Sequence, residues 1–529
     1  MLHPQPKAHK QKIDWFITLM PLALICLLCL LFIGFPVQSK RVVNQLHSVL
    51  VNVFGSYYIV LGLGFFLVSM FVALSKRGTI RLGTIEKPRY GNLAWGSMVF
   101  TATMAADILF FALHEWAFYY QSMPLDMTEM TLAQKQLWAS SYPIFHWGAI
   151  PWSFFILPAA AYGYMMHVKG RNRQRLSEAC RPMLGRKVDG ALGKGIDLVG
   201  VFGMMAGAAT TFSLATPLIT LAMQEVFGFP VNKWTTIAIL LVIAAVYTIG
   251  VVFSFSGIAY VAKLCVILFI ALAVSFLIGS DLLYTVETAI TSLGNVINNF
   301  FRMSTWLDPL RLSAGQGVQA GVSAAAFPQS WTVFYWAYWI AWCVATPFFI
   351  GKISEGRTIR QTILGGYVAG LGGTFASMWI FGGYGLHQQV TGRLDVAALL
   401  AGGASQSEAI VAIFRTLPMP NVSLFLLIAS MILFYASTFD ALTMVMATYS
   451  YRDLGAEEEP GRGIKGFWAL LFVLLPTALL FTEQTLSQLQ TVSIVVALPI
   501  SAVLLIIVAG FFKESKKTLT MGTQKEESK

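Results

Sequence analysis

Long apolar runs separated by polar loops recur along the whole chain of 529 residues. A run of about 18 or more apolar residues with few charges has the length and composition of a membrane-spanning helix. The first run lacks the cleavage pattern of a secretory signal peptide, so we expect it to stay in the protein as a helix. The pattern therefore predicts an all-α membrane protein with twelve transmembrane helices. These helices are expected at residues 15–36, 51–75, 94–120, 143–167, 196–221, 235–256, 258–280, 330–351, 361–384, 421–449, 465–482 and 490–512.

Basic residues are concentrated in alternate loops of this pattern. The net charge is +11, and Lys and Arg cluster before the first helix and after the second, fourth, eighth and twelfth. The loops 121–142 and 385–418 between these sets carry few of them. Because basic loops stay on the cytoplasmic side, both termini are expected in the cytoplasm. The charge is therefore no sign of a nucleic-acid partner.

The order of the helices predicts an internal repeat. After two leading helices, ten remain in two sets of five, and the odd number in each set gives the sets opposite orientations, as in many secondary transporters. An amphipathic helix over 285–303 is expected on the outer surface between the sets. The expected divisions are a cytoplasmic N-terminal tail 1–14, two leading helices 15–93, a first five-helix repeat 94–280, an extracytoplasmic connector 281–329, a second repeat 330–512 and a cytoplasmic C-terminal tail 513–529.

The polar residues give no sign of an enzyme. The five cysteines form no metal-ligand spacing, and no nucleophile and base stand at a workable spacing. We therefore expect no catalytic residue and no cofactor. A channel would need a polar-lined pore or a selectivity ring, whereas the chain offers an aromatic cluster.

That cluster begins in residues 328–360, where Trp336, Trp339 and Trp342 lie three residues apart in an apolar segment. Residues with this spacing lie near one face of a helix. Tryptophan in membrane helices usually collects at the interfaces, but this series continues to a greater depth. Stacked indole faces attract a cation that cannot donate hydrogen bonds, such as a quaternary ammonium group.

A second aromatic segment, 145–155, reads Phe-His-Trp-Gly-Ala-Ile-Pro-Trp-Ser-Phe-Phe. With the Trp-rich segment and the loop Ile-Ser-Glu-Gly-Arg-Thr-Ile-Arg at 353–360, it closely resembles the betaine/choline/carnitine transporter (BCCT) family. The resemblance extends over the twelve-helix plan and implies the LeuT-like inverted repeat of five plus five helices. It also implies alternating-access transport of a trimethylammonium compound such as choline, glycine betaine or carnitine.

The resemblance implies a central aromatic box for the trimethylammonium headgroup. Phe155 stands where the family usually has Tyr, which removes a hydroxyl but keeps a ring face. Tyr338 stands where many members have another Trp. The implied substrate-binding residues are Trp147, Trp152, Phe155, Tyr338, Trp339 and Trp342.

Asp107 is expected in the middle of the third helix, with no Lys or Arg within a helical turn. A carboxylate inside a membrane is costly, so it marks a functional site by default. Sodium-coupled betaine carriers of the family have Gly-x-Gly-x-Gly here, whereas carriers resembling the proton-coupled choline symporters place Asp at the third glycine position. In this chain the three positions read Thr103, Ala105 and Asp107. Asp107 is therefore expected to neutralise a cationic substrate, to accept a coupling proton, or to do both.

The coupling ion is left open between H+ and Na+. The resemblance implies a sodium site near Thr101, Met104, Phe434, Ser437 and Thr438, although such hydroxyls also bond their own helix. Lys263 is a second intramembrane charge, which in exchangers of the family would replace the ion, or which could reach the interface by snorkelling. Proton-coupled symport is favoured, with sodium-coupled symport, precursor–product antiport and a transporter-like membrane sensor as alternatives.

Two further expectations concern the outer side and the assembly. Glu115 and His114, followed by several aromatic residues, are expected to form a rim at the outer mouth, and His146 is expected to be a structural hydrogen-bonding residue. The resemblance also suggests a homotrimer in the lipid bilayer, held together by the surface helix 285–303 and the second helix.

Overall fold

The computed structural model describes residues 12–101, 105–125, 127, 129–171, 173–253, 258–313, 327–452, 454, 458–481 and 486–527. Helices dominate these residues, and the β-structure within them is limited to two isolated bridges, Ile13 with Tyr451 and Arg81 with Thr358. The all-α prediction is confirmed.

Each predicted span coincides with one helix or with two consecutive helices. Among the described residues, eight helices are long and apolar enough to cross a membrane, or up to eleven if each bent pair is counted as one span. The predicted span that is not among these eleven, 465–482, corresponds to α21. The elements are α1 Trp15–Gly34, α3 Gly55–Leu74, α4 Asn92–Thr101 with α5 Ala105–Gln121, α6 Leu132–His146 with α7 Ala149–Gly163, α10 Ala191–Phe227, α11 Lys233–Phe253, α12 Ile258–Gly279, α14 Val333–Ala341 with α15 Thr346–Ile353, α16 Ile359–Ser377 with α17 Gly383–Val390, α20 Pro420–Tyr449, α21 Arg462–Phe481 and α22 Leu486–Glu527.

Further helices and short turns connect these helices. The amphipathic helix predicted over 285–303 is present as α13, whereas the pattern of apolar runs did not predict α2, because its segment is polar. The connecting elements are α2 Pro36–Val53, α8 Leu176–Ala179, α9 Arg181–Leu184, α13 Leu282–Thr305, α18 Val396–Ala401 and α19 Gln406–Arg415, with short turns η1 Lys76–Thr79, η2 Tyr164–Val168, η3 Gly185–Asp189, η4 Pro309–Ser313, η5 Pro328–Thr332 and η6 Met378–Gly382.

The first helix of each predicted set of five is broken. The axes of α4 and α5 differ by 67°, and those of α14 and α15 by 57°. The second break has a local cause, because Pro347, the second residue of α15, has no backbone N–H and disfavours a helical conformation in the residue before it. Before it, the chain tightens, and the N–H groups of Trp342 and Cys343 bond to carbonyls only three residues back.

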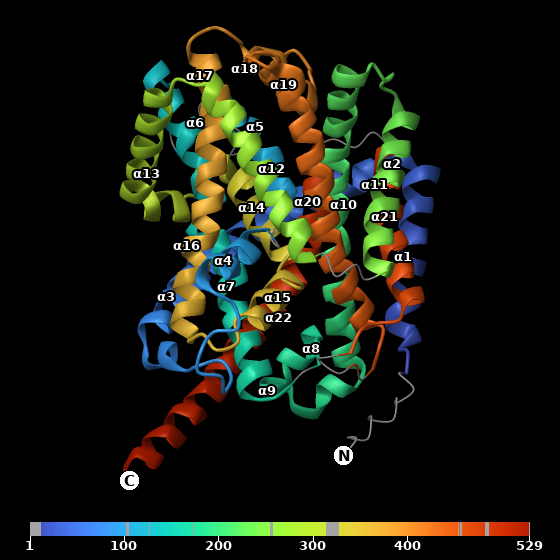
Figure 1. The fold of residues 1–529 in the computed structure, drawn as a ribbon, viewed down its shortest axis with the longest axis vertical. Helices are drawn as coiled ribbons and strands as arrows, with labels where there is room; N and C mark the ends of the chain where they lie inside the picture. The colour runs from blue at the N-terminus through green and yellow to red at the C-terminus, as the bar shows by residue number, and fades with distance from the viewer. Residues whose placement is uncertain are drawn as a thin grey trace.

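The start of α1 and the end of α22 lie at the same end of the bundle, together with α8 and α9, whereas α17 and α18 lie at the opposite end (Figure 1). The basic segment that contains α8 and α9 is therefore on the same side as these two helix ends. This arrangement agrees with an even number of crossings.

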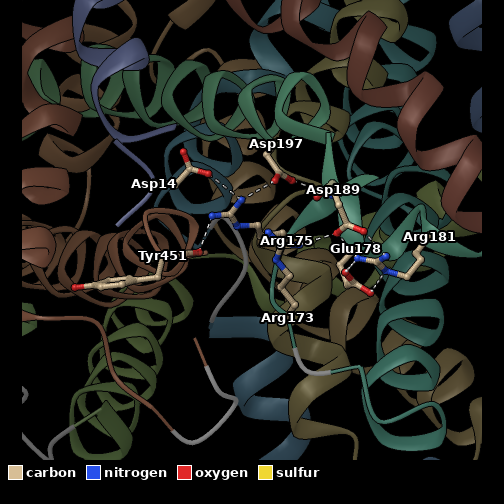
Figure 2. A network of polar contacts seen from close by, with 9 residues as sticks. Asp14, Arg173, Arg175, Glu178, Arg181, Asp189, Asp197 and Tyr451 are labelled. Atoms are coloured by element: carbon tan, nitrogen blue, oxygen red, sulfur yellow. Dashed lines mark hydrogen bonds and ion pairs between the residues drawn. The ribbon is translucent and has the colours of Figure 1, made fainter. Parts of the chain in front are cut away.

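A buried ionic network joins distant segments at the end that carries the termini (Figure 2). The Arg175 guanidinium lies 3.3 Å from Asp197 of α10 and 3.7 Å from Asp14, just before α1. It also donates to the carbonyls of Tyr449 and Tyr451 at the end of α20, at 2.8 and 2.6 Å. Arg175 is 3% exposed. One side chain therefore connects the N-terminal segment, the segment before α8, α10 and α20.

A more exposed ion pair borders this network. Arg181 donates to both carboxylate oxygens of Glu178 and of Asp189. These hydrogen bonds hold the pKa of Asp189 below its usual value. Because half of the Asp189 side chain is exposed, solvent screens this pair and it contributes little to stability.

Candidate functional site

Trp339 of α14 is at the centre of a buried cluster of aromatic rings. Its ring centroid lies 4.8 Å from that of Phe155 and 5.4 Å from those of Trp147 and Trp152. The planes are inclined by 49° to 66°, as in edge-to-face and tilted pairs. The structure thus brings together four of the six residues that the sequence proposes for the aromatic box.

The helix break between α6 and α7 presents two of these rings. Trp147 and Gly148 form the break, and a Cβ on Gly148 would lie 2.3 Å from the carbonyl oxygen of Ile144. Only glycine fits this close approach of the chain to the preceding turn. Trp152, one turn further along, donates its indole N–H to Thr374 Oγ1 at 3.2 Å. Its ring lies against Gly370 of α16, where a Cβ would approach to 2.5 Å.

The other two proposed box residues lie beside the cluster. Tyr338 stacks on Phe334 at 5.4 Å, and its hydroxyl lies 3.4 Å from Thr211 Oγ1 of α10. Trp342 follows α14 and packs against Gly207 of α10, where a Cβ would lie 2.8 Å from the indole. Among the described residues, Trp342 makes no ring contact with the Trp339 cluster comparable to those above. Trp342 therefore lies between α10 and the end of α14.

The cluster is closed. Trp147, Trp152, Phe155 and Trp339 are fully buried. A cavity of about 780 Å³ lies elsewhere, between α4, α12 and α16, and its lining includes Thr101 and Phe434 but none of the box aromatics. A small molecule reaches the rings only when the helices around them separate.

Asp107 lies in the first turn of α5 and is 2% exposed. Its Oδ2 accepts a hydrogen bond from Thr211 Oγ1 at 2.9 Å. Thr211 also approaches the Tyr338 hydroxyl, so a hydroxyl of α10 links the carboxylate to α14. Within the described residues around Asp107, no salt bridge to Lys or Arg is formed, which leaves the carboxylate able to attract a proton or a cationic ligand.

The residues proposed for a coupling ion are dispersed in this conformation. Thr101 ends α4 and its hydroxyl donates to Ser97 at 2.9 Å. Thr438 of α20 is 4% exposed, and its hydroxyl has no hydrogen-bond partner among the described residues. Ser437 beside it and Lys263 of α12 are less buried, Lys263 being exposed. Met104 lies outside the described residues, and Phe434 faces the cavity.

A buried polar chain runs behind the aromatic cluster. Glu115 of α5 accepts the Trp147 indole N–H at 2.6 Å through Oε2, and the Tyr119 hydroxyl donates to its Oε1. Tyr119 also bonds to His146 Nδ1 at 2.7 Å, and His146 Nε2 lies 3.0 Å from Thr332 Oγ1. The expectation that Glu115 and His114 form an outer rim was wrong, because both are fully buried. Their position near the end of an apolar run suggested a mouth, but α6 and η6 pack against α5, and Trp331 of η5 contacts the rings of Phe118 and Tyr119.

Sequence reasoning missed the polar partners of these side chains. Thr211, Thr332 and Thr374 gave no signal, because their roles depend on contacts between helices far apart in the sequence. Tyr119 was counted among the aromatic residues of the expected rim, although its place four residues after Glu115, on the same helix face, indicates a partner for that carboxylate. An intramembrane carboxylate with such a neighbour is a candidate for a functional network.

Comparison with known proteins identifies the family. Residues 16–520 match the family described as BCCT, betaine/carnitine/choline family transporter. Over 487 residues the chain is 28% identical to the glycine betaine transporter OpuD of Bacillus subtilis, covering 91% of this chain and 90% of that one. It is 28% identical over 452 residues to the uncharacterized transporter YeaV of Escherichia coli, covering 85% and 90%. It is 25% identical over 524 residues to the high-affinity choline transport protein of Escherichia coli, covering 96% and 73%.

A solved structure of a Na+-coupled sialic acid symporter is similar over 86% of this chain and 87% of that one, with a TM-score of 0.45 and 11% identity. The family match covers nearly the whole chain and confirms the resemblance seen in the aromatic segments. The chain belongs to the betaine/carnitine/choline transporter family, and it is a multi-pass membrane transporter rather than an enzyme.

Proposed function

We propose that the chain carries a trimethylammonium compound across the membrane by alternating access, with the aromatic cluster around Trp339 binding the headgroup. The observation that supports this most is the convergence of Trp147, Trp152 and Phe155 on Trp339. A quaternary ammonium group has no N–H to donate, so it cannot form hydrogen bonds to carboxylates or carbonyls, whereas ring faces attract it directly. Each suitable face contributes about 0.5–2 kcal/mol.

Choline is the preferred substrate within this class. Glycine betaine and carnitine carry their own carboxylate, whereas choline is a bare cation and gains most from a fixed anion nearby. Asp107 supplies a buried carboxylate near α14. The relatives include proteins named for choline and for glycine betaine, so these two compounds and carnitine are the set to test.

Proton-coupled symport is the preferred mode of coupling. A buried carboxylate without a cationic partner favours holding a proton, and a cation bound beside it favours proton release. Substrate binding at Asp107 would therefore be linked to proton movement. Sodium coupling is the alternative, supported by the hydroxyl of Thr438 beside Ser437, which has no hydrogen-bond partner among the residues that the structure describes. Exchange that depends on Lys263 is less favoured, because that side chain is exposed.

We propose that the protein lies in a bacterial plasma membrane with both termini in the cytoplasm. The alternation of basic loops along the sequence supports this orientation, as does the position of the basic segment with α8 and α9 beside the start of α1 and the end of α22. We also propose a homotrimer, with α13 and α3 supplying contacts. A transporter-like sensor is the alternative from another class.

Flux measurements in proteoliposomes test the proposal. Labelled choline, glycine betaine and carnitine are added outside, under an imposed proton gradient or an imposed sodium gradient. Saturable uptake of at least one compound that is lost in Trp339→Ala is the expected result. Binding of the compound without flux would instead favour a sensor, and the absence of both binding and flux for all three would overturn the proposal.

A further inference from the structure

The four indoles proposed to face the substrate differ in what lies behind their N–H groups. Trp147 donates to a carboxylate oxygen of Glu115 at 2.6 Å, whereas Trp152 donates to the neutral hydroxyl of Thr374 at 3.2 Å. The N–H groups of Trp339 and Trp342 are buried without a partner in the part of the chain that the structure describes. Trp147 is thus distinguished from the other three by its acceptor.

Among the described residues Asp107 accepts one hydrogen bond, whereas Glu115 accepts one on each oxygen, and these bonds oppose the cost of burial and favour a charged carboxylate. Its two oxygens accept from different donors, Trp147 Nε1 and the Tyr119 hydroxyl. Because the Tyr119 hydrogen points to Glu115, the Tyr119 oxygen accepts from His146 Nδ1. His146 Nδ1 also lies 4.0 Å from Glu115 Oε1. A chain of donors that all point toward one acceptor stabilises negative charge on it, and bonds to ionised groups are the short and strong ones.

A negative charge behind an indole N–H changes the face of the ring. The carboxylate draws the N–H hydrogen toward itself and leaves more electron density on the indole. The attraction of a cation for an aromatic face is electrostatic, so it strengthens as that density rises. Both residues are fully buried, and a low dielectric leaves the effect poorly screened. The Trp147 ring lies against Trp339 at 5.4 Å, so it belongs to the cluster itself.

We infer that Glu115 is a specificity-determining residue of the aromatic site, which acts through the Trp147 indole to favour a permanently cationic headgroup over an uncharged group of the same shape. The inference rests on the proposed function. Glu115 does not touch the substrate in this role; it positions Trp147 and polarises its ring. Thr374 behind Trp152 holds an indole in place without adding charge.

The test compares two ligands of equal shape. One is choline, and the other is its neutral isostere, in which a tert-butyl group replaces the trimethylammonium group. Glu115→Gln keeps an acceptor for the Trp147 N–H but removes the charge. We expect this variant to bind choline about 3- to 20-fold more weakly, while affinity for the isostere changes by less than about twofold. Thr374→Val is the matched control, and its effect on the two ligands should be equal.

Two further measurements keep the result independent of folding. Glu115→Gln should leave the choline-to-isostere ratio unchanged when it is added to Trp147→Phe, which lacks the N–H, because the two residues act as one unit. Ultraviolet resonance Raman spectra should show one indole N–H with a weaker hydrogen bond in Glu115→Gln than in the wild type. If Glu115→Gln does not fold, Tyr119→Phe is the second variant: it removes one donor to the Glu115 carboxylate and should lower the choline-to-isostere ratio, because the charge behind Trp147 is then less stable.

The outcomes separate the inference from the proposed function. If the wild type binds choline and the ratio is unchanged in Glu115→Gln, or both ligands weaken equally, Glu115 has only a structural role and the inference is wrong. If the wild type binds choline, glycine betaine and carnitine no better than unrelated solutes, the proposed function fails and the inference fails with it.

Discussion

Thr211 Oγ1 donates a hydrogen bond to Asp107 Oδ2 at 2.9 Å, and each residue is at most 2% exposed. The two residues come from different helices, α10 and α5, and the same hydroxyl approaches Tyr338 of α14. A change in the charge of Asp107 would therefore alter the hydrogen bonding of Thr211 and, through it, of Tyr338, which lies on the same helix as Trp339. This relationship makes Asp107 the residue through which we expect binding and coupling to be connected.

Asp107→Gly should abolish accumulation of choline driven by a proton gradient. The variant removes the proposed proton carrier and the anion that compensates a bare cation. Proteoliposomes with separately imposed proton and sodium gradients give the measurement. Thr211→Val is the control, because it removes one hydrogen bond to the carboxylate, at a cost of about 1.5–3 kcal/mol, but keeps the carboxylate. Unchanged choline uptake and pH response in Asp107→Gly would show that the assigned role is wrong.

Trp339→Ala should weaken binding of the transported solute more than Trp342→Ala does. Trp339 contacts three other rings, whereas Trp342 packs on Gly207 outside that cluster. For each variant the expected loss is about 1–3 kcal/mol or complete, since packing is lost together with cation–π attraction. Titration calorimetry of purified variants gives the affinities. Undiminished binding of choline, glycine betaine and carnitine in both variants would show that the aromatic box does not bind the substrate.

The fold was predictable where apolar length alone decides the element. Every predicted span has a helical counterpart, because a membrane leaves few alternatives for a long apolar run. The polar segment of α2 was missed for the same reason. Pro347 signals the break before α15 in the sequence, but the close approach of Trp342 to Gly207 of α10 does not follow from it.

The candidate site was predictable in its rings and less so in its polar contacts. Trp147 and Trp152 were predicted because they belong to the aromatic segment 145–155, which resembles a motif of the family. Glu115 was assigned to a rim because its position along the helix is visible in the sequence, while the covering by η5 is not. Thr211 and Thr374 depend on contacts between helices far apart in sequence, which spacing within one helix cannot indicate.

Thr438→Val should leave proton-driven uptake within about twofold of the wild type and should not destabilise the protein. The hydroxyl is buried without a partner among the described residues, so replacing it by a methyl group removes an unsatisfied polar atom at constant shape. Thermal unfolding and uptake under each gradient give the two measurements. If uptake instead requires a sodium gradient and the variant needs much more sodium, the sodium-coupled alternative is correct.

Arg175→Ala should lower the stability of the protein by about 3–5 kcal/mol, because it leaves Asp14 and Asp197 buried without their shared cation. It also removes the hydrogen bonds to two carbonyls at the end of α20. Arg173→Ala is the matched control, since Arg173 is 25% exposed and faces an Asp189 that is half exposed. Denaturation of the detergent-solubilised variants compares them, and equal losses of stability would contradict a special role for Arg175.

The last prediction concerns α13, whose polar side faces the protein. Thr285, Thr288 and Ser292 are buried, and Asn295 donates to Ser141 of α6 at 3.0 Å. The opposite side is apolar and exposed. It consists of Leu283, Val286, Ile290, Ile297 and Phe301.

This exposed stripe is expected to contact a second copy of the chain in the homotrimer. Ile297→Glu should therefore dissociate the assembly, because it places a charge on a contact that excludes water. Thr291→Glu, on the same helix but outside the apolar stripe, is the matched control and should leave the trimer intact. Light scattering coupled to size-exclusion chromatography in mild detergent measures the mass of each variant. A wild-type protein that is monomeric at high concentration would contradict the trimer, and an Ile297→Glu variant that stays trimeric would move the contact away from α13.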